Sequence, residues 1–191
     1  YAGGIQCYSL DDTNVFANCT ITANSGNWGG GMVLYQSSPA ISECTFVSNS
    51  ATSGGGLYVY DASPQITDCA FSSNAGDWGG GMHLYYASPQ IDGSTFWGNS
   101  GGTGGGIYSW ASSPTITACM FTANNITEDG AGIYFYQGTG ATVTSCVFTK
   151  NTAKYAGGVG CGEASPTISR CTFTGNAVTE AGGAIECEDA Q

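Results

Sequence analysis

The sequence predicts an all-β protein, a right-handed parallel β-helix of about seven coils with three short strands per coil. First, asparagine recurs at intervals of 25 to 27 residues. Second, a phenylalanine or isoleucine lies three residues before each of these asparagines. Third, a glycine triplet precedes a short segment of alternating residues in most copies. A fixed period of this length is typical of a solenoid. The asparagine column is Asn24, Asn49, Asn74, Asn99, Asn124, Asn151 and Asn176.

The composition favours strands and turns over helices. Glycine accounts for 31 of the 191 residues, and only 9% of the residues are charged. Glycine costs about 1 kcal/mol relative to alanine inside a helix, so a chain this rich in glycine forms few helices. Parallel strands need crossover connections, and these are almost always right-handed, which predicts the hand of the coil.

One copy of the repeat, residues 104–124, shows the expected elements in order. Its glycine triplet, 104–106, turns a corner. The strand 107–110 then alternates, with Ile107 and Ser109 expected to point inward. A second strand follows Ser-Pro, because proline suits the first residue of a strand. The third strand has the pattern Cys-x-Phe with both residues inward, and the asparagine that follows is expected to bond to its copies above and below.

The repeat spans the chain, so residues 1–191 are interpreted as a single β-helix domain. Insertions between copies are short and fall in turns, as expected for a solenoid whose strands are stacked. The sequence begins and ends within a repeat, and we expect it to be a segment of a longer protein or the subunit of a filament, since parallel edges invite end-to-end stacking.

Several copies resemble a known repeat. The segments 46–49, 71–74, 121–124 and 173–176 each read Phe-x-x-Asn, and residues 182–185 read Gly-Gly-Ala-Ile. These resemble the FxxN and GGAI repeats of chlamydial polymorphic outer-membrane proteins and of related secreted bacterial β-helix proteins. The resemblance implies a secreted or cell-surface location and a role as an adhesin or other extracellular solenoid. The chain is also similar in fold to pectate lyases, which makes carbohydrate binding or processing an alternative.

The charged residues argue against catalysis and against nucleic acid as a partner. The net charge is −11, with 14 acidic residues and three basic ones, Lys150, Lys154 and Arg170. Phosphate binding needs clustered lysine or arginine, so nucleic acid is a poor partner.

The single histidine, His83, occupies a column of tyrosines and is interpreted as a surface substitute for tyrosine. No apolar run is long enough to insert this segment into a membrane. The sequence therefore predicts a protein that is not an enzyme.

Metal, thiol and glycan sites have weak signals. No cofactor is predicted, although Asp77, Glu128 and Asp129 lie in glycine-rich turns, and calcium binds such oxygen ligands. Six of the nine cysteines fall in one inward column, where stacked free thiols and disulfides between coils both remain open. Asn18 and Asn125 begin N-glycosylation sequons.

Aromatic residues on the first strand of each coil are the candidate binding residues. If the alternation holds, they point outward and form a nearly flat aromatic surface, and exposed aromatic patches usually mark interaction sites. The sequence thus predicts a non-enzymatic extracellular structural or adhesive module that self-associates or binds a cell-surface protein or polysaccharide. The candidate residues are Tyr35, Tyr58, Tyr60, His83, Tyr85, Tyr108, Trp110, Tyr134 and Tyr136.

Overall fold

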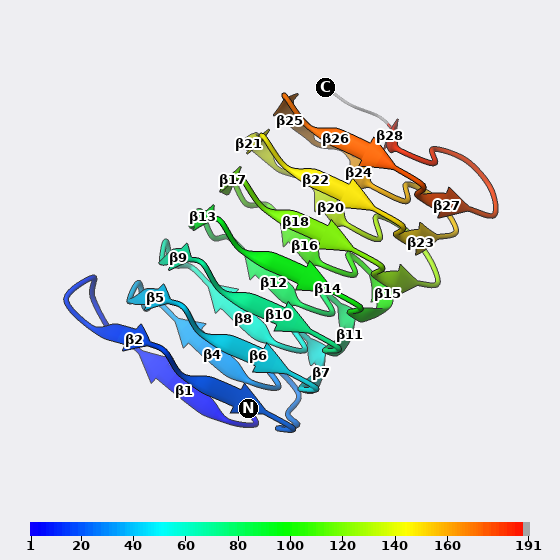
Figure 1. The fold of residues 1–191 in the computed structure, drawn as a ribbon. Helices are drawn as coiled ribbons and strands as arrows, with labels where there is room; N and C mark the ends of the chain where they lie inside the picture. The colour runs from blue at the N-terminus through cyan, green and yellow to red at the C-terminus, as the bar shows by residue number, and fades with distance from the viewer. Residues whose placement is uncertain (189–191) are drawn as a thin grey trace.

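The predicted fold class is confirmed. The computed structural model describes residues 1–188, and within that range every regular element is a short β-strand (Figure 1). All strand pairs are parallel, and each strand pairs with the equivalent strand one coil away. The coils stack from the N-terminus at one end of the solenoid to the C-terminal coil at the other (Figure 1).

Four parallel sheets run the length of the stack. The first sheet contains β1 (Ile5–Tyr8), β4 (Met32–Tyr35), β8 (Leu57–Tyr60), β12 (Met82–Tyr85), β16 (Ile107–Trp110), β20 (Ile133–Tyr136), β24 (Val159–Gly162) and β28 (Ile185–Glu188). The second sheet contains β2 (Val15–Ala17), β5 (Ala40–Ser42), β9 (Gln65–Thr67), β13 (Gln90–Asp92), β17 (Thr115–Thr117), β21 (Thr139–Thr144) and β25 (Ser165–Ser169).

The third sheet contains β3 (Thr20–Thr22), β6 (Thr45–Val47), β10 (Ala70–Ser72), β14 (Thr95–Trp97), β18 (Met120–Thr122), β22 (Val147–Thr149) and β26 (Thr172–Thr174). The fourth sheet contains β7 (Ser50–Ser53), β11 (Ala75–Trp78), β15 (Ser100–Thr103), β19 (Asn125–Ile126), β23 (Thr152–Ala153) and β27 (Ala177–Val178).

The fourth sheet is a correction to the three strands expected per coil. Most of its strands are very short, polar or glycine-rich, as in the Ser-Gly-Gly-Thr of β15, and they lack the alternation that predicts a strand. Backbone hydrogen bonds between coils create them. The Ala75 amide donates to the Asn49 carbonyl at 2.9 Å, and the Ser100 amide donates to the Asn74 carbonyl at 2.9 Å. Stacking of coils therefore imposes strand geometry where local sequence does not.

The core consists of columns of like residues, one from each coil. Met82 and Leu84 of β12 point inward and are fully buried, together with Ile91 of β13. On the third sheet the phenylalanine rings stack nearly parallel, with 4.7 Å between the centroids of Phe46 and Phe71 and an interplanar angle of 5°. Burying the same residue type in each coil lets every coil pack against the next in the same way.

The asparagine column follows the phenylalanine column along the chain. Its side chains form hydrogen bonds with one another and with the backbone. The amide nitrogen Nδ2 of Asn74 donates to the Phe46 carbonyl at 2.9 Å and to Oδ1 of Asn99 at 3.1 Å. The backbone amide of Asn74 donates to the same Oδ1 at 3.0 Å. The bonds repeat in the neighbouring coils, so a polar column lies buried in the turn without losing hydrogen bonds.

The glycine triplet allows the corner between the fourth and first sheets. Gly79 has a φ of +70°, a backbone conformation that residues with a side chain rarely adopt. Two residues later, a Cβ at Gly81 would lie 2.6 Å from the Gly106 carbonyl oxygen and 2.9 Å from the Phe96 ring. The corner is therefore tight enough to bring the end of the fourth sheet over the first.

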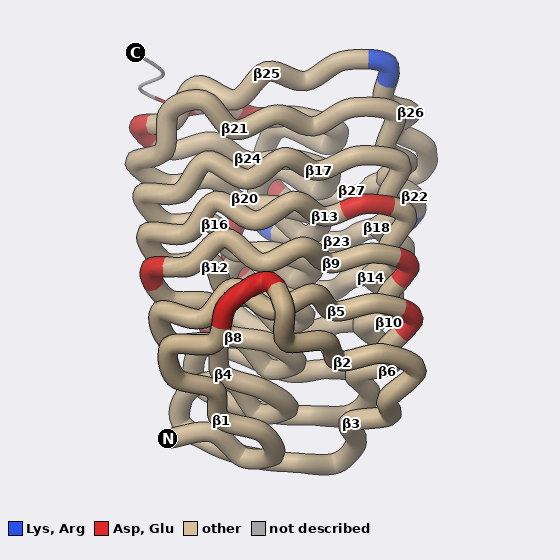
Figure 2. Tube along the Cα trace, turned by 90° about the vertical axis from the view of Figure 1, so that its left-hand side faces the viewer, with Lys and Arg blue, Asp and Glu red and all other residues tan. Residues whose placement is uncertain are grey.

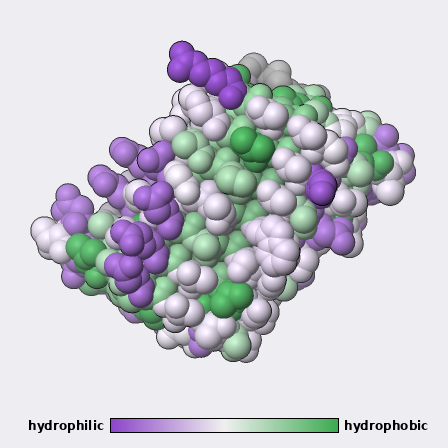
Figure 3. All heavy atoms as spheres, in the orientation of Figure 1, coloured by the Kyte–Doolittle hydropathy of each residue, from purple (hydrophilic) through white to green (hydrophobic). Residues whose placement is uncertain are grey.

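The outer face over the third sheet is mainly neutral. Its outward residues are mostly threonine and serine, and Figure 3 shows near-neutral atoms with small hydrophobic spots. Trp97 and Met120 are its large exposed residues, 55% and 50% exposed. Among residues 1–188 there is no helix that is long and apolar enough to cross a membrane.

Candidate functional site

An aromatic cleft lies on the outer side of the first sheet, where the fourth sheet turns into it. Its volume is about 420 Å³. Three of the four tryptophans in the chain line it. Ligand sites usually measure roughly 300–1,000 Å³ and are lined mainly by apolar and aromatic side chains, so the cleft is of the right size and character. The lining residues are Trp28, Tyr35, Ser53, Tyr58, Tyr60, Trp78, His83, Tyr85 and Trp110.

Two tryptophans form one wall of the cleft. Trp28, Ser53 and Trp78 occupy the same position in successive coils, directly before the glycine corner. Large and small residues thus alternate along the stack. Strands are about 4.8 Å apart, so the backbones that carry the two indoles are separated by about 9.6 Å, with only a serine between them. The alternation leaves the gap that forms the cleft.

The two indoles differ in their contacts with other aromatic rings. Trp28 stacks on Tyr58, with 5.9 Å between centroids and an interplanar angle of 17°. Trp78 stacks on no other aromatic ring of the described chain. The two are similarly exposed, at 48% and 47%. Trp78 therefore presents to the cleft a half-exposed indole on which no aromatic ring of the described chain stacks.

The floor of the cleft corrects the expectation of a flat aromatic surface. Tyr58, His83 and Tyr108 point away from the core, yet they are only 7%, 5% and 6% exposed. The glycine corner brings the end of the fourth sheet beside the first, and the outward side chains pack closely on one another. His83 meets both tyrosine rings edge to face, at 5.1 Å from Tyr58 and 4.9 Å from Tyr108. The outer face is thus concave and partly buried.

His83 is the only histidine and the most unusual residue of the floor. It is buried, so its interpretation as a surface substitute for tyrosine is wrong. Neither Nδ1 nor Nε2 has a hydrogen-bond partner. Burial lowers the pKa of His83 to about 3, because the imidazolium would lose its hydration there. At neutral pH the floor of the cleft therefore contains a neutral imidazole whose two nitrogens are buried without hydrogen bonds.

The rim opposite the tryptophan wall is a ladder of tyrosines that ends in Trp110. Tyr35 stacks on Tyr60 at 4.6 Å and 12°, and Tyr60 stacks on Tyr85 at 5.6 Å and 23°. Tyr85 meets Trp110 edge to face at 5.2 Å. The faces of Tyr35, Tyr60 and Tyr85 are therefore largely engaged with one another, and the ladder presents mainly ring edges and hydroxyl groups to the cleft.

A second hollow of about 340 Å³ adjoins the cleft toward the N-terminal end. It shares Trp28 and Tyr35 with the cleft and extends to Gln6 and Tyr8 of β1. Trp28 therefore separates two hollows that follow one another along the solenoid axis.

The structure does not bring all nine predicted aromatic residues into the cleft. Tyr35, Tyr58, Tyr60, His83, Tyr85 and Trp110 line it, whereas Tyr108 lies buried beside His83. Tyr136 lies beyond Trp110, at 5.8 Å between centroids. Tyr134 lines a different pocket.

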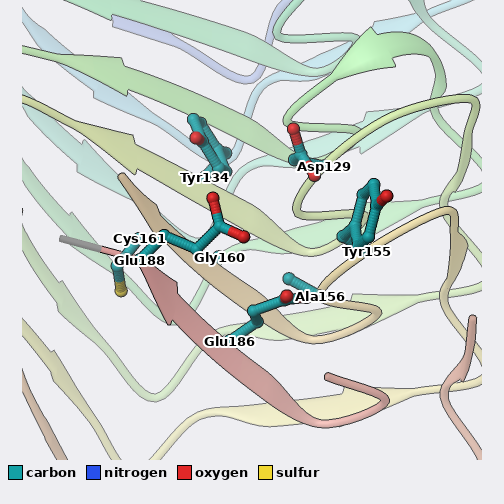
Figure 4. Close-up of a pocket in the computed structure, with 8 residues that line it drawn as sticks. All are labelled: Asp129, Tyr134, Tyr155, Ala156, Gly160, Cys161, Glu186 and Glu188. Carbon is teal, nitrogen blue, oxygen red and sulfur yellow. The ribbon is translucent and has the colours of Figure 1, made fainter. Parts of the chain in front are cut away.

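That different pocket is small and acidic (Figure 4). Its volume is about 30 Å³, room for about one water molecule, and Tyr134 lines it with Asp129, Glu186 and Glu188. Burial raises the pKa of Asp129, and the nearby Glu128, Glu186 and Glu188 raise it further, because each negative charge disfavours another. The pocket is too small for an organic ligand.

The remaining candidate sites are the acidic residues considered for calcium, the two glycosylation sequons and the cysteines. No group of three or more histidine, cysteine or acidic residues among residues 1–188 is arranged to hold a metal ion. Asp77 is exposed, and Glu128 lies 3.9 Å from the Lys154 ammonium. Asn18 and Asn125 are exposed and so accessible to glycosylation. All nine cysteines are free thiols, including those of the inward column.

The sequence analysis missed Trp28 and Trp78. It assigned binding to the strand that follows the glycine triplet, and these residues precede it. The available signal was the segment Trp-Gly-Gly-Gly at residues 28–31 and again at 78–81, two periods apart. A large residue beside a tight corner must lie against the neighbouring sheet or in solvent, and here it does both.

With this geometry in view, comparisons with known proteins identify the fold family. A family model described as right handed beta helix region matches residues 3–173 and, in a second match, residues 105–191. The chain belongs to this right-handed β-helix family. The family includes non-enzymatic members and members that process polysaccharides, so membership of the β-helix family decides no activity. Neither the comparison with curated proteins nor that with solved structures gave a match.

Proposed function

We propose that this β-helix is a non-catalytic binding module of a secreted or cell-surface protein, and that it holds part of its partner in the aromatic cleft. The observation that carries the proposal is the gap between Trp28 and Trp78, above a floor that contains an unpartnered imidazole. Tryptophan and tyrosine in desolvated hollows contribute a large share of binding energy at interfaces.

The lining of the cleft supports binding over catalysis. It contains no carboxylate, lysine or arginine. Its one titratable base is His83, and general acid–base catalysis near neutral pH works best with a pKa close to that pH. With a pKa lowered to about 3, His83 is a weak base for such chemistry.

The shape of the cleft supports a ligand or a protruding segment over a flat partner. Two copies of this face would meet at their rims, because the floor lies behind the two exposed indoles. Self-association through this face would therefore leave the cleft unfilled. Assembly of a filament through the ends of the solenoid stays a separate prediction.

Carbohydrate binding is the second candidate, and Trp78 favours it. Sugar rings pack on the faces of aromatic side chains, and Trp78 has a free face at the mouth of the cleft. The tyrosine ladder favours it less, because stacking between Tyr35, Tyr60 and Tyr85 already uses most of their ring faces.

A screen by tryptophan fluorescence tests the proposed function. Three of the four tryptophans line the cleft, so a bound ligand should change the emission. The panel would contain polysaccharides, oligosaccharides and small organic ions. The double variant Trp28→Ser/Trp78→Ser should lose the response, and Trp97→Ser, exposed on the third sheet, should keep it. Full binding by a folded double variant would contradict the proposal.

A further inference from the structure

We propose that the cleft recognises an organic cation, specifically a trimethylammonium group such as that of choline, by enclosing it between aromatic rings. This inference rests on the proposed function, because it names the ligand class of the same cleft. Three features of the described residues carry it: the free ring faces, the charge around the cleft and the state of His83.

The rings supply the attraction. A cation over the face of an aromatic ring is drawn to the negative electrostatic potential of that face, and tryptophan is the strongest partner. The free indole face of Trp78 borders the gap, and Trp28 closes the other end of it. Tyr58 lies between them at the floor. A trimethylammonium group has no N–H to hydrogen-bond, so an aromatic enclosure suits it better than it suits a primary amine.

The charge around the cleft selects the sign of the ligand. Residues 1–149 contain no lysine or arginine, and every residue that lines the cleft lies in this range. Arg170 lies between β25 and β26 in the chain, and Figure 2 shows these two strands near the C-terminal end of the stack, far along the axis from β8.

Two exposed carboxylates lie next to cleft residues in the chain. Asp61 follows Tyr60, and Asp77 precedes Trp78. Asp61 accepts a hydrogen bond at 3.0 Å from the neutral amide of Gln36, and no cation among residues 1–188 forms an ion pair with it. Asp77 itself faces a shallow hollow on the fourth sheet, so its charge lies beside the cleft and not within its lining. The pKa of Tyr60 is raised first by Tyr35, then by loss of hydration and then by the negative charge of Asp61, as expected for a carboxylate beside the rim.

His83 completes the selection. Burial keeps the imidazole neutral at physiological pH, so it adds no positive charge to repel a cation. Its two ring nitrogens are buried and have no hydrogen-bond partner, so the ring contributes an uncharged aromatic surface to the floor. An anionic saccharide, by contrast, would meet uncompensated carboxylates and no base.

The decisive experiment compares two ligands of the same shape and different charge. Choline chloride and its uncharged carbon isostere, 3,3-dimethylbutan-1-ol, are titrated into the full chain by calorimetry and by tryptophan fluorescence. A desolvated cation–π contact predicts that choline binds about tenfold or more tightly than the isostere. Trp78→Leu should lose most of the difference, and the control Trp97→Leu should retain it.

The outcomes separate this inference from the proposed function. Equal binding of choline and the isostere, or preferential binding of a neutral saccharide, would overturn the cation while leaving the cleft as a binding site. Absence of any tryptophan response across the whole ligand panel would overturn both. The double variant Asp61→Asn/Asp77→Asn should weaken choline severalfold and leave the isostere unchanged. Binding of free choline would identify a free ligand, and binding of phosphatidylcholine vesicles would identify a lipid headgroup. Either result would support the inference.

Discussion

The inner and outer faces of the first sheet are built from the same strands, yet their side chains are under different packing constraints. Along β12, Met82 and Leu84 point inward and are fully buried, as their counterparts in neighbouring coils are. The outward residues, His83 and Tyr85, differ from coil to coil in type, exposure and ring contacts. The inner face repeats because each coil must pack on the next, while the outer face is free of that constraint and can carry a specific site.

The largest expected effect comes from adjacent residues on opposite faces. Leu84→Ala should lower the free energy of unfolding by about 3–5 kcal/mol, because it removes fully buried methyl groups and leaves a cavity. Tyr85→Ala should lower it by about 1 kcal/mol, since the ring is only partly buried and its main contacts are with other rings. Urea denaturation measures both. Equal losses would show that the two faces do not differ in the way described.

The next largest effect is a pH dependence of the free energy of unfolding, and it arises from His83 on the outer face. The folded pKa of His83 is about 3, against 6.5 for an ordinary histidine. Between these values the unfolded chain binds a proton that the folded chain does not, so stability falls as the pH falls from 6.5 toward 3. Lowering the pH from 7 to 4.5 should cost about 2–3 kcal/mol through this group.

His83→Tyr is the matched control, since tyrosine occupies this position in both adjacent coils. Carboxylates also titrate at acidic pH, but they are common to both proteins, so the difference between the two denaturation curves isolates His83. The histidine resonances in NMR provide a direct check. Titration of the imidazole near pH 6.5 would contradict its burial.

The smallest effect tests the inner face with two buried serines. Ser109 is fully buried in the core column of β16, and its hydroxyl has no hydrogen-bond partner. Ser94 is equally buried, but its Oγ accepts from the Cys69 amide at 3.1 Å and donates to the Asp92 carbonyl at 3.1 Å.

Opposite signs are therefore expected for the same substitution. Ser109→Ala should stabilise the protein by about 1 kcal/mol, because an unpaired buried hydroxyl is removed. Ser94→Ala should destabilise it by about 1 kcal/mol, because the Cys69 amide loses its acceptor. Thermal and urea denaturation of the pair measure this difference. The same sign for both would show that the two hydroxyl groups do not differ in their bonding.

Much of the fold could be predicted because the repeat is visible in the residues that stack. The asparagine column and the alternation along 107–110 both reflect contacts between equivalent positions, so one period describes every coil. The fourth sheet could not be predicted in this way. Strands such as Ser100–Thr103 form because the backbones above and below are already in place, and no hydrophobic pattern marks them.

The candidate site was predictable in part. Six of the nine proposed aromatic residues line the cleft, because alternation correctly placed them on the outer side of the first sheet. Alternation says nothing about what covers an outward residue. The burial of Tyr58 and His83, and the part played by Trp28 and Trp78, depend on how the corner folds.

The sequence alone determined the period, the inward columns and the acidic charge, since each depends on residue type and spacing. The tertiary structure decided that the aromatic face is concave and that its histidine is buried and neutral. The physical reason is the tight corner at the glycine triplet, where Gly79 adopts a φ of +70° and joins two sheets at close range. Residues on the two sides of that corner become neighbours across coils, and a chemical environment formed in this way is a property of their packing.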